Sequence, residues 1–278
     1  MAIPQWRTIA RARTVTPARL ASALNLITNL IEGPGLRTGE RCAAIFAVVL
    51  SAALAGFFAG CAGPVSKEVC GLVLATQGPV EISGQPAGPF RPADVRSLLC
   101  ARTVVRTPAG SSAQLACLPN ALIHLSQQSV FEINSLTLTK DGNETDEEVQ
   151  ERAVRCRLVV GAIDFSHRGA EGVAEFILST THGDLNAKFN CVAHVVVDDR
   201  KIRITCASGM LTFSPARGGK PVTVEAGFVS EWPSQEPAVP IAAKTASEQQ
   251  TLIGAFDAAQ QLESLAKERG AMVPWKSR

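Results

Sequence analysis

The side chains of this sequence that could do catalytic or metal chemistry are its four histidines and eight cysteines. The histidines are His124, His167, His182 and His194. They have no paired His or carboxylate spacing typical of a metal site, and no GxSxG or Cys–His signature accompanies them. The sequence therefore predicts no catalytic residue, no metal and no cofactor. His124 and His194 are expected to be strand residues, and His182, beside Gly183 in a turn, is the one candidate for a surface ligand.

The cysteines leave the disulfide pattern open. They are Cys42, Cys61, Cys70, Cys100, Cys117, Cys156, Cys191 and Cys206. If Cys42 is removed with a signal segment and Cys61 carries lipid, six cysteines remain, and six cysteines allow fifteen pairings. Disulfides are plausible in an oxidising compartment. Cys156 and Cys206, however, stand at apolar strand positions and could equally be small buried hydrophobic residues. No CxxC or Cys/His spacing of a zinc site is present.

A hydrophobic segment runs from Ala43 to Gly60, 18 residues without a charge. As a helix it would be roughly 27 Å long, near the lower limit for crossing a hydrocarbon core of about 30 Å. It is apolar on every face, which favours a signal or membrane segment over a buried helix of a soluble domain. Phe58, Ala59 and Gly60 before Cys61 resemble a bacterial lipobox, which implies cleavage before Cys61 and lipidation of this residue. Cleavage and a retained transmembrane helix both remain open.

The charges around this segment predict its topology. Before Cys61 the chain has six Arg but only two acidic residues, Glu32 and Glu40. This excess of positive charge predicts that the N-terminus lies in the cytoplasm and residues 62–278 lie outside it. Residues 1–41 are then a cytoplasmic tail, or a leader that results from a start codon placed too far upstream. Six of the 27 basic and two of the 25 acidic side chains lie before Cys61, so the remainder has a net charge of −2. This balance excludes the dense basic patch that nucleic-acid binding requires.

The rest of the chain predicts an all-β domain followed by one helix. From Val69 to Trp232, short apolar or alternating runs are separated by Gly, Pro and Asn about every ten residues. In Lys201 to Cys206 the alternation puts Ile202, Ile204 and Cys206 on the core side. Residues 233–246 form a Pro-rich linker. Residues 247–270 have the pattern of an amphipathic helix, with Ser247 as a cap, Gly270 as the stop and an apolar stripe of Leu252, Phe256, Ala259, Leu262 and Leu265 or Ala266.

Several motifs of residues 69–232 occur in an order that resembles one known family. They are GPVEI (78–82), VVRT (104–107), SAQL (112–115), LPNALIHL (118–125), RLVVGAI (157–163), AEFILST (174–180), SGMLTF (208–213) and VTVEAG (222–227). This order is similar to the FecR domain of iron-dicitrate sensor proteins. Asn120 stands where that family usually has Gly, and Asn tolerates the left-handed conformation that Gly would adopt. Lys188-Phe189-Asn190 replaces the family's Arg-Gly-Thr turn, which is the largest departure.

The resemblance implies a β-sandwich or β-solenoid and a non-enzymatic function. The expected protein is anchored in a bacterial membrane by lipid or helix, with its β domain in the periplasm. There it would bind a protein partner and relay or scaffold an envelope signal. The N-terminus carries one short helical pattern instead of the family's long anti-sigma region, so direct sigma-factor control is not predicted. A structural or glycan-binding envelope lipoprotein is the alternative, and a hydrolase is the least favoured.

Overall fold

The computed structural model describes residues 65–140, 149–169, 174–187, 189–216, 218–233 and 240–270. Nearly all of them belong to one unit, made of Ser66–Lys140 and Glu148–Arg278. The hydrophobic segment, the lipobox and Cys61 lie outside the described residues, as do residues 1–41. Within the described part of the chain, no helix is long and apolar enough to cross a membrane.

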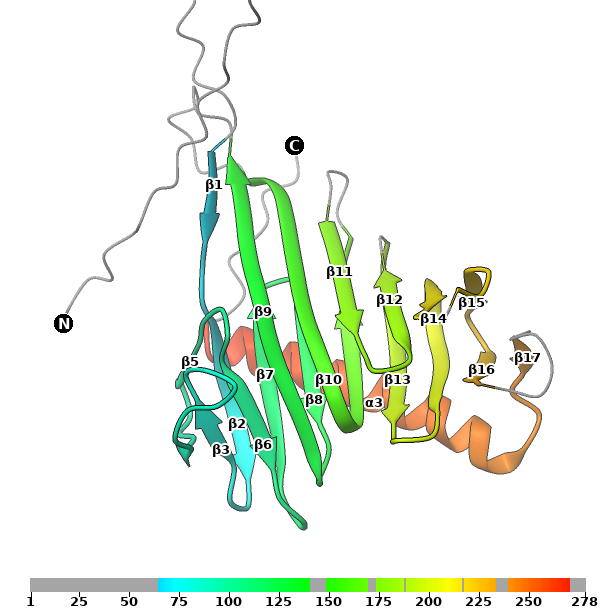
Figure 1. Cartoon of the computed structure of the whole chain (residues 1–278), viewed down its shortest axis with the longest axis horizontal. Helices are drawn as coiled ribbons and strands as arrows, with labels where there is room; N and C mark the ends of the chain where they lie inside the picture. The colour runs from blue at the N-terminus through cyan, green and yellow to red at the C-terminus, as the bar shows by residue number, and fades with distance from the viewer. Residues whose placement is uncertain are drawn as a thin grey trace, which may run out of the picture. The chain divides into compact units, whose positions relative to one another are not determined.

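The described residues form strands β1 to β17 and helix α3 (Figure 1). The strands are β1 (Val65–Glu68), β2 (Gly71–Gln77), β3 (Glu81–Ser83), β4 (Arg91–Pro92), β5 (Leu98–Leu99), β6 (Val104–Thr107), β7 (Ser112–Leu118), β8 (Ala121–Leu125), β9 (Ser129–Lys140), β10 (Val149–His167), β11 (Ala174–Ser179), β12 (Gly183–Ala187), β13 (Cys191–Val197), β14 (Ile202–Pro215), β15 (Val222–Glu225), β16 (Phe228–Trp232) and β17 (Ile241–Ala242). The helix α3 is Ala246–Glu268.

The strands pair into two sheets. Sheet A has the order β4-β3-β6-β9-β10-β11-β12-β14-β15. Sheet B has the order β5-β2-β7-β8-β10-β13-β14-β16-β17. Of these pairings only β10 with β11 is parallel. The antiparallel pairings with short turns are what the punctuated strand pattern predicts.

One hydrophobic core lies between the two sheets, and it confirms the predicted all-β class. Alternate residues of both sheets point into it, so that Phe165 of sheet B stacks on Phe176 of sheet A with ring centroids 4.6 Å apart. Ile202, Ile204 and Cys206 are each 0% exposed, as their alternation predicts. The core is built mainly from aliphatic side chains and a few Phe, because the sequence contains no Tyr.

Strands β10 and β14 belong to both sheets, a feature that the sequence motifs did not predict. The strand β10 leaves sheet A and enters sheet B at Gly161, whose φ is +106°. The strand β14 leaves sheet B and enters sheet A at Gly209, whose φ is +75°. A Cβ would lie 2.1 Å from Ser129 Oγ at the first position and 1.8 Å from the Asn190 oxygen at the second. Only glycine fits a corner with this conformation and this close approach.

The two sheet-changing strands are also alike in sequence. Residues 149–166 align with residues 197–214 when Gly161 is placed on Gly209. The further identical pairs are Val149 and Val197, Arg152 and Arg200, Arg155 and Arg203, Phe165 and Phe213, and Ser166 and Ser214. The first segment passes from sheet A to sheet B and the second passes back. The fold therefore uses one kind of corner twice, in opposite directions.

Helix α3 covers the outer face of sheet B. It contacts β8, β10, β13 and β14, all of them strands of that sheet, and passes behind them in Figure 1. Leu262 and Ala266 pack on outward-facing residues of sheet B, among them Leu122. Sheet B therefore lies between the core and α3.

The helix departs from the sequence prediction at its start and on its buried face. Thr245, not Ser247, is the cap: its side chain accepts from the Glu248 N–H while the Glu248 carboxylate accepts from the Thr245 N–H. The buried residues are Ala255, Ala259, Leu262 and Ala266. Phe256 is 42% exposed because the small alanines, and not this aromatic ring, face the sheet.

Candidate functional site

His182, the ligand candidate, lies in the turn between β11 and β12. Its Nε2 lies 2.7 Å from the backbone oxygen of Asp198, so the ring donates a hydrogen bond to the turn between β13 and β14. Asp198 Oδ1 accepts from the N–H groups of Arg200 and Lys201 at 2.7 and 2.8 Å, and these hydrogen bonds lower the pKa of the Asp198 carboxyl. The imidazole thus connects a turn of sheet A with a turn of sheet B. Its role as a surface ligand stays a prediction.

A second polar cluster lies on the outer face of sheet B and consists of His124, Asp164 and His194. Asp164 on β10 is the register partner of His124 on β8 and of His194 on β13. Its Oδ2 lies 3.2 Å from His124 Nδ1, and its Oδ1 lies 2.7 Å from His194 Nδ1. The side chains are 28%, 13% and 23% exposed in that order. One carboxylate thus accepts a hydrogen bond from an imidazole on each side.

The charge of this cluster is set by competing effects on Asp164. Its burial raises the pKa of the carboxyl, whereas the hydrogen bonds and charges of the two histidines lower it, and the lowering wins. Asp164 is therefore ionised at neutral pH. An ionised carboxylate can only accept hydrogen bonds, so each imidazole carries a hydrogen on Nδ1 and leaves Nε2 as an acceptor while it is neutral.

The sequence correctly predicted that His124 and His194 lie on strands, but it did not predict that the Asp164 carboxylate accepts a hydrogen bond from both. The three residues are far apart in the chain, and only the strand order β8-β10-β13 makes them neighbours. Alternation alone places His124 and His194 on the outer face of their strands. Without the sheet order, that pattern does not say which strands are adjacent.

The hydrogen bonds of the cluster do not form a nucleophile–base pair. In the described part of the chain, neither His124 nor His194 hydrogen-bonds to a hydroxyl or a thiol. No group of three or more His, Cys, Asp or Glu side chains in the described ranges is arranged to hold a metal ion. The arrangement joins β8, β10 and β13 through one carboxylate on the outer face of sheet B.

His167 is the buried histidine. It is 1% exposed, stands at the end of β10 with its ring 5.7 Å from that of Phe176, and neither ring nitrogen makes a hydrogen bond of good geometry. Burial lowers its pKa to about 4, and the nearby backbone of Ala174 and Asn120 offsets only part of this effect. His167 is neutral at physiological pH and belongs to the core.

An open hollow of about 400 Å³ lies on one side of β6 and β9. The charged residues lining it are Glu81 and Arg106, whose carboxylate and guanidinium are paired at 2.9 Å. The guanidinium also lies 3.9 Å from the centroid of the Phe90 ring. Both charges of the hollow thus have partners within the chain.

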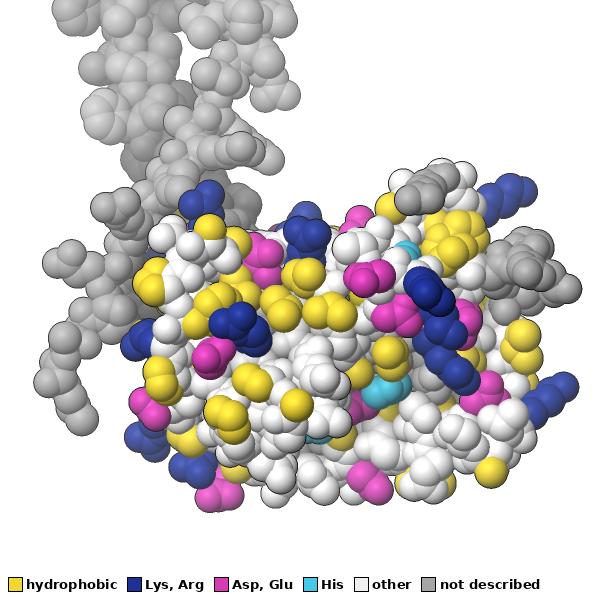
Figure 2. Space-filling view, turned by 60° about the horizontal axis from the view of Figure 1, so that its bottom comes forward, with side chains coloured by type: hydrophobic (Ala, Val, Ile, Leu, Met, Phe, Trp, Pro, Cys, Tyr) yellow, Lys and Arg dark blue, Asp and Glu magenta, His cyan; other side chains and the backbone are white. Residues whose placement is uncertain are grey.

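The outer face of sheet A carries mostly polar side chains on the row considered next. Arg155, Ile177, Asn186, Thr212 and Thr223 are successive register neighbours across it. Arg155 pairs with the Glu175 carboxylate at 3.0 Å. Figure 2, turned so that the bottom of the view in Figure 1 comes forward, shows basic and acidic side chains interspersed among hydrophobic ones.

Comparison with known proteins gives a partial likeness of fold. No family model matches the sequence. No curated protein matches it either. Two crystal structures of a proposed anti-sigma factor from Parabacteroides distasonis, at 2.50 and 1.65 Å resolution, are similar at 15% identity with TM-scores of 0.37 and 0.36. Each similarity covers 50% of this chain and 59% of that protein. Likeness at this level carries no argument about function.

Proposed function

We propose that this protein is a non-enzymatic, membrane-anchored FecR-like protein of the bacterial cell envelope. Its β domain lies outside the cytoplasm, binds a partner protein, and relays or scaffolds an envelope signal. The observation that supports export is the disulfide between Cys70 and Cys100, which joins the beginning of β2 to the end of β5. Disulfides persist in oxidising compartments and are rare in the cytosol. The domain begins directly after the hydrophobic segment that predicts export.

The outer face of sheet A is the surface that we assign to the partner. The described helix α3 contacts strands of sheet B, so sheet A keeps its polar outer side. Arg157 and Ser214 are exposed there. Interfaces that form and separate are about as polar as the rest of a protein surface. A face of this kind suits a partner that binds reversibly.

Anchoring is tested by weighing the mature protein from fractionated membranes. A fragment that starts at Cys61 and carries a diacyl or triacyl mass supports the lipoprotein form, and Cys61→Ser should then release or mislocalise the protein. The matched control is Cys42→Ser, which changes a cysteine outside the lipobox and should leave the protein in place. An intact chain in the membrane fraction supports the retained helix instead. Full-length protein in the cytosolic fraction would overturn the anchoring.

Partner binding is tested with a photocrosslinking residue placed on each face. A crosslinker at Arg157 or Ser214 should capture a discrete envelope protein in cells. The control position is Asp257, which is exposed on α3 and should capture nothing. Retention of the purified protein on peptidoglycan or polysaccharide, without a protein crosslink, would favour the alternative of a glycan-binding lipoprotein.

A further inference from the structure

Two buried thiols lie side by side where β14 approaches its corner. Cys191 begins β13, and Cys206 precedes Gly209 on β14; the thiols are 1% and 0% exposed. In the register, Cys191 lies opposite Gly209 and Ala193 lies opposite Cys206. The register shifts by one residue between these two pairs. Both side chains point into the core from adjacent strands.

The two thiols interact directly and unequally. The Cys191 thiol donates a hydrogen bond to the Cys206 sulfur, which lowers the pKa of Cys206 and raises that of Cys191. The Cys206 thiol has its own acceptor, the backbone oxygen of Ser208 at 3.4 Å. The two sulfurs are therefore hydrogen-bond neighbours in the packed domain, and the thiolate is the form in which a cysteine attacks a disulfide.

The other two buried thiols behave differently and provide a contrast. Cys117 belongs to β7 of sheet B and Cys156 to the sheet A part of β10. Burial raises the pKa of both, that of Cys117 to about 12. The Cys156 thiol donates to the backbone oxygen of Ile177 at 3.5 Å. Cys117 also raises the pKa of Cys156 through its charge, so these two thiols are near each other, but neither donates a hydrogen bond to the other in the described contacts.

We propose that Cys191 and Cys206 are a second oxidisable pair of this domain, which a disulfide donor converts into a disulfide while the chain folds. The thiolate of one cysteine attacks one sulfur of the donor R–S–S–R, which gives a mixed disulfide and one R–S⁻. The thiolate of the other cysteine then attacks the first cysteine's sulfur, forms the new S–S bond and releases the second R–S⁻. The two thiols give up two protons and two electrons, and the donor takes the electrons.

The burial of the pair decides when the reaction takes place. A donor molecule cannot reach either sulfur once β13 and β14 have packed against the core. The exchange must occur before this packing, in the same oxidising surroundings that close Cys70 with Cys100. The bond would tie β13 to β14 beside the corner at Gly209. This inference needs only a disulfide donor and does not rest on the function of the protein.

The test is to refold the reduced, full-length chain in a mixture of reduced and oxidised glutathione. The product is denatured with N-ethylmaleimide to block free thiols and digested with trypsin, which places the two cysteines in separate peptides, residues 189–200 and 204–217. We expect these peptides to be linked, with the peptide of Cys117 alkylated. Alkylation of both peptides in protein whose Cys70–Cys100 bond has closed would overturn the proposal, as would a link to Cys117 or Cys156.

Two variants make the result specific. In Cys191→Ser the peptide of Cys206 should become alkylated, because its partner sulfur is gone. In Cys117→Ser the link between the two peptides should persist unchanged. A link that disappears in Cys117→Ser, in protein that has closed Cys70 with Cys100, would contradict the assignment of the pair. Protein that refolds in reductant and meets glutathione disulfide only afterwards should keep both thiols alkylatable, because burial then excludes the donor.

Discussion

At the scale of single residues, two histidine environments of this protein differ in their hydrogen bonds and their burial. The imidazoles of His124 and His194 share the Asp164 carboxylate at the surface of sheet B. His167 lies in the core without a carboxylate beside it, and burial keeps it neutral. The first environment joins three strands through one carboxylate, and the second opposes a charge on its imidazole. Each therefore predicts its own experiment.

The stability of the domain should fall in mild acid because of His167. Its pKa in the folded state is about 4, below the ordinary value of 6.5, so the unfolded chain binds the proton more readily. The stability that depends on the neutral ring is complete above pH 6.5 and is lost as the pH falls towards 4. The loss is on the order of 3 kcal/mol. Urea denaturation between pH 7 and pH 4 measures it, and His167→Phe should flatten this part of the profile; an unchanged slope would assign the dependence to other groups.

Asp164→Asn should destabilise the domain at neutral pH by about 1–3 kcal/mol, since the amide keeps one acceptor oxygen and places an NH2 donor against the other ring N–H. The change keeps the size of the side chain, so packing on sheet B is preserved. The matched control is Asp184→Asn on β12, whose side chain is exposed, and it should stay within about 0.5 kcal/mol of the parent. Chemical denaturation at pH 7 gives both values. Equal effects of the two substitutions would contradict a special role for the cluster.

At the scale of elements, the two strands that belong to both sheets are the parts least visible in the sequence. Gly161 and Gly209 stand inside the motifs RLVVGAI (157–163) and SGMLTF (208–213), and a glycine inside a strand pattern does not by itself show that the strand changes sheet. Here each of the two glycines turns a continuous strand around a corner. The likeness of residues 149–166 to 197–214 was the sequence feature that could have revealed this.

Alanine at either corner should be severely destabilising. A Cβ at Gly161 would lie 2.1 Å from Ser129 Oγ, and one at Gly209 would meet the backbone oxygen of Asn190. We expect Gly161→Ala and Gly209→Ala to lower the free energy of unfolding by more than about 3 kcal/mol. Gly110→Ala is the control, since Gly110 has a φ of +71° but nothing within 4 Å of the added Cβ. It should cost roughly 1–2 kcal/mol from backbone strain alone, and an equal loss at all three positions would argue against the close approach.

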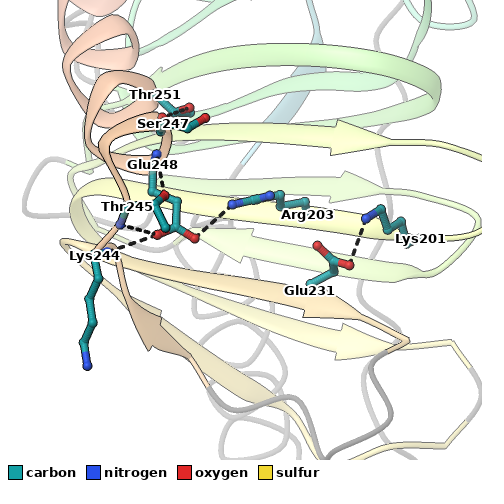
Figure 3. A network of polar contacts seen from close by, with 8 residues as sticks. All are labelled: Lys201, Arg203, Glu231, Lys244, Thr245, Ser247, Glu248 and Thr251. Carbon is teal, nitrogen blue, oxygen red and sulfur yellow. Dashed lines mark hydrogen bonds and ion pairs between the residues drawn. The ribbon is translucent and has the colours of Figure 1, made fainter.

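The start of α3 depends on a network of polar contacts (Figure 3). Glu248 accepts from the backbone N–H groups of Lys244 and Thr245 and pairs with the Arg203 guanidinium on β14 at 3.0 Å. These contacts lower the pKa of the Glu248 carboxyl, chiefly through the backbone of Thr245. The network both caps the helix and fastens it to sheet B.

Removal of the cap should therefore loosen α3. Thr245→Ala should destabilise the helix by about 1 kcal/mol, within the usual range of 0.5–2 kcal/mol for a lost N-cap. Ser247→Ala, two residues on, is the matched control and should change little, because the Ser247 contact shown is made by its backbone oxygen, which accepts from Thr251. Amide hydrogen exchange along α3 measures the difference. A larger effect of Ser247→Ala would instead support Ser247 as the N-cap, as the sequence pattern predicted.

At the scale of the whole molecule, the sequence predicted the all-β class and most strands but not their arrangement. Alternation fixes which side of a strand is buried, as at Ile202 and Ile204, and turn residues fix where a strand ends. Neither feature says which strands pair, so the neighbours of Asp164 remained hidden. Asn120 was expected to allow a left-handed turn, yet the described non-glycine residues with positive φ are Arg96, Arg102 and Gln128. Asn120 instead donates its side-chain N–H to the Arg168 oxygen at 3.1 Å.

The shared strands also determine how the domain should respond to pulling. Tension from the N-terminal side enters next to β1, where Val69, directly after that strand, donates to the Leu136 oxygen of β9. The strand β9 is in turn paired along its length with β10. Since β10 is bonded in one sheet and then in the other, a load on it shears hydrogen bonds of both layers together. We expect the domain to rupture in a single step when it is stretched between its ends in an optical trap, and Gly161→Ala to lower that rupture force. Stepwise release of one hairpin after another would mean that the layers come apart separately.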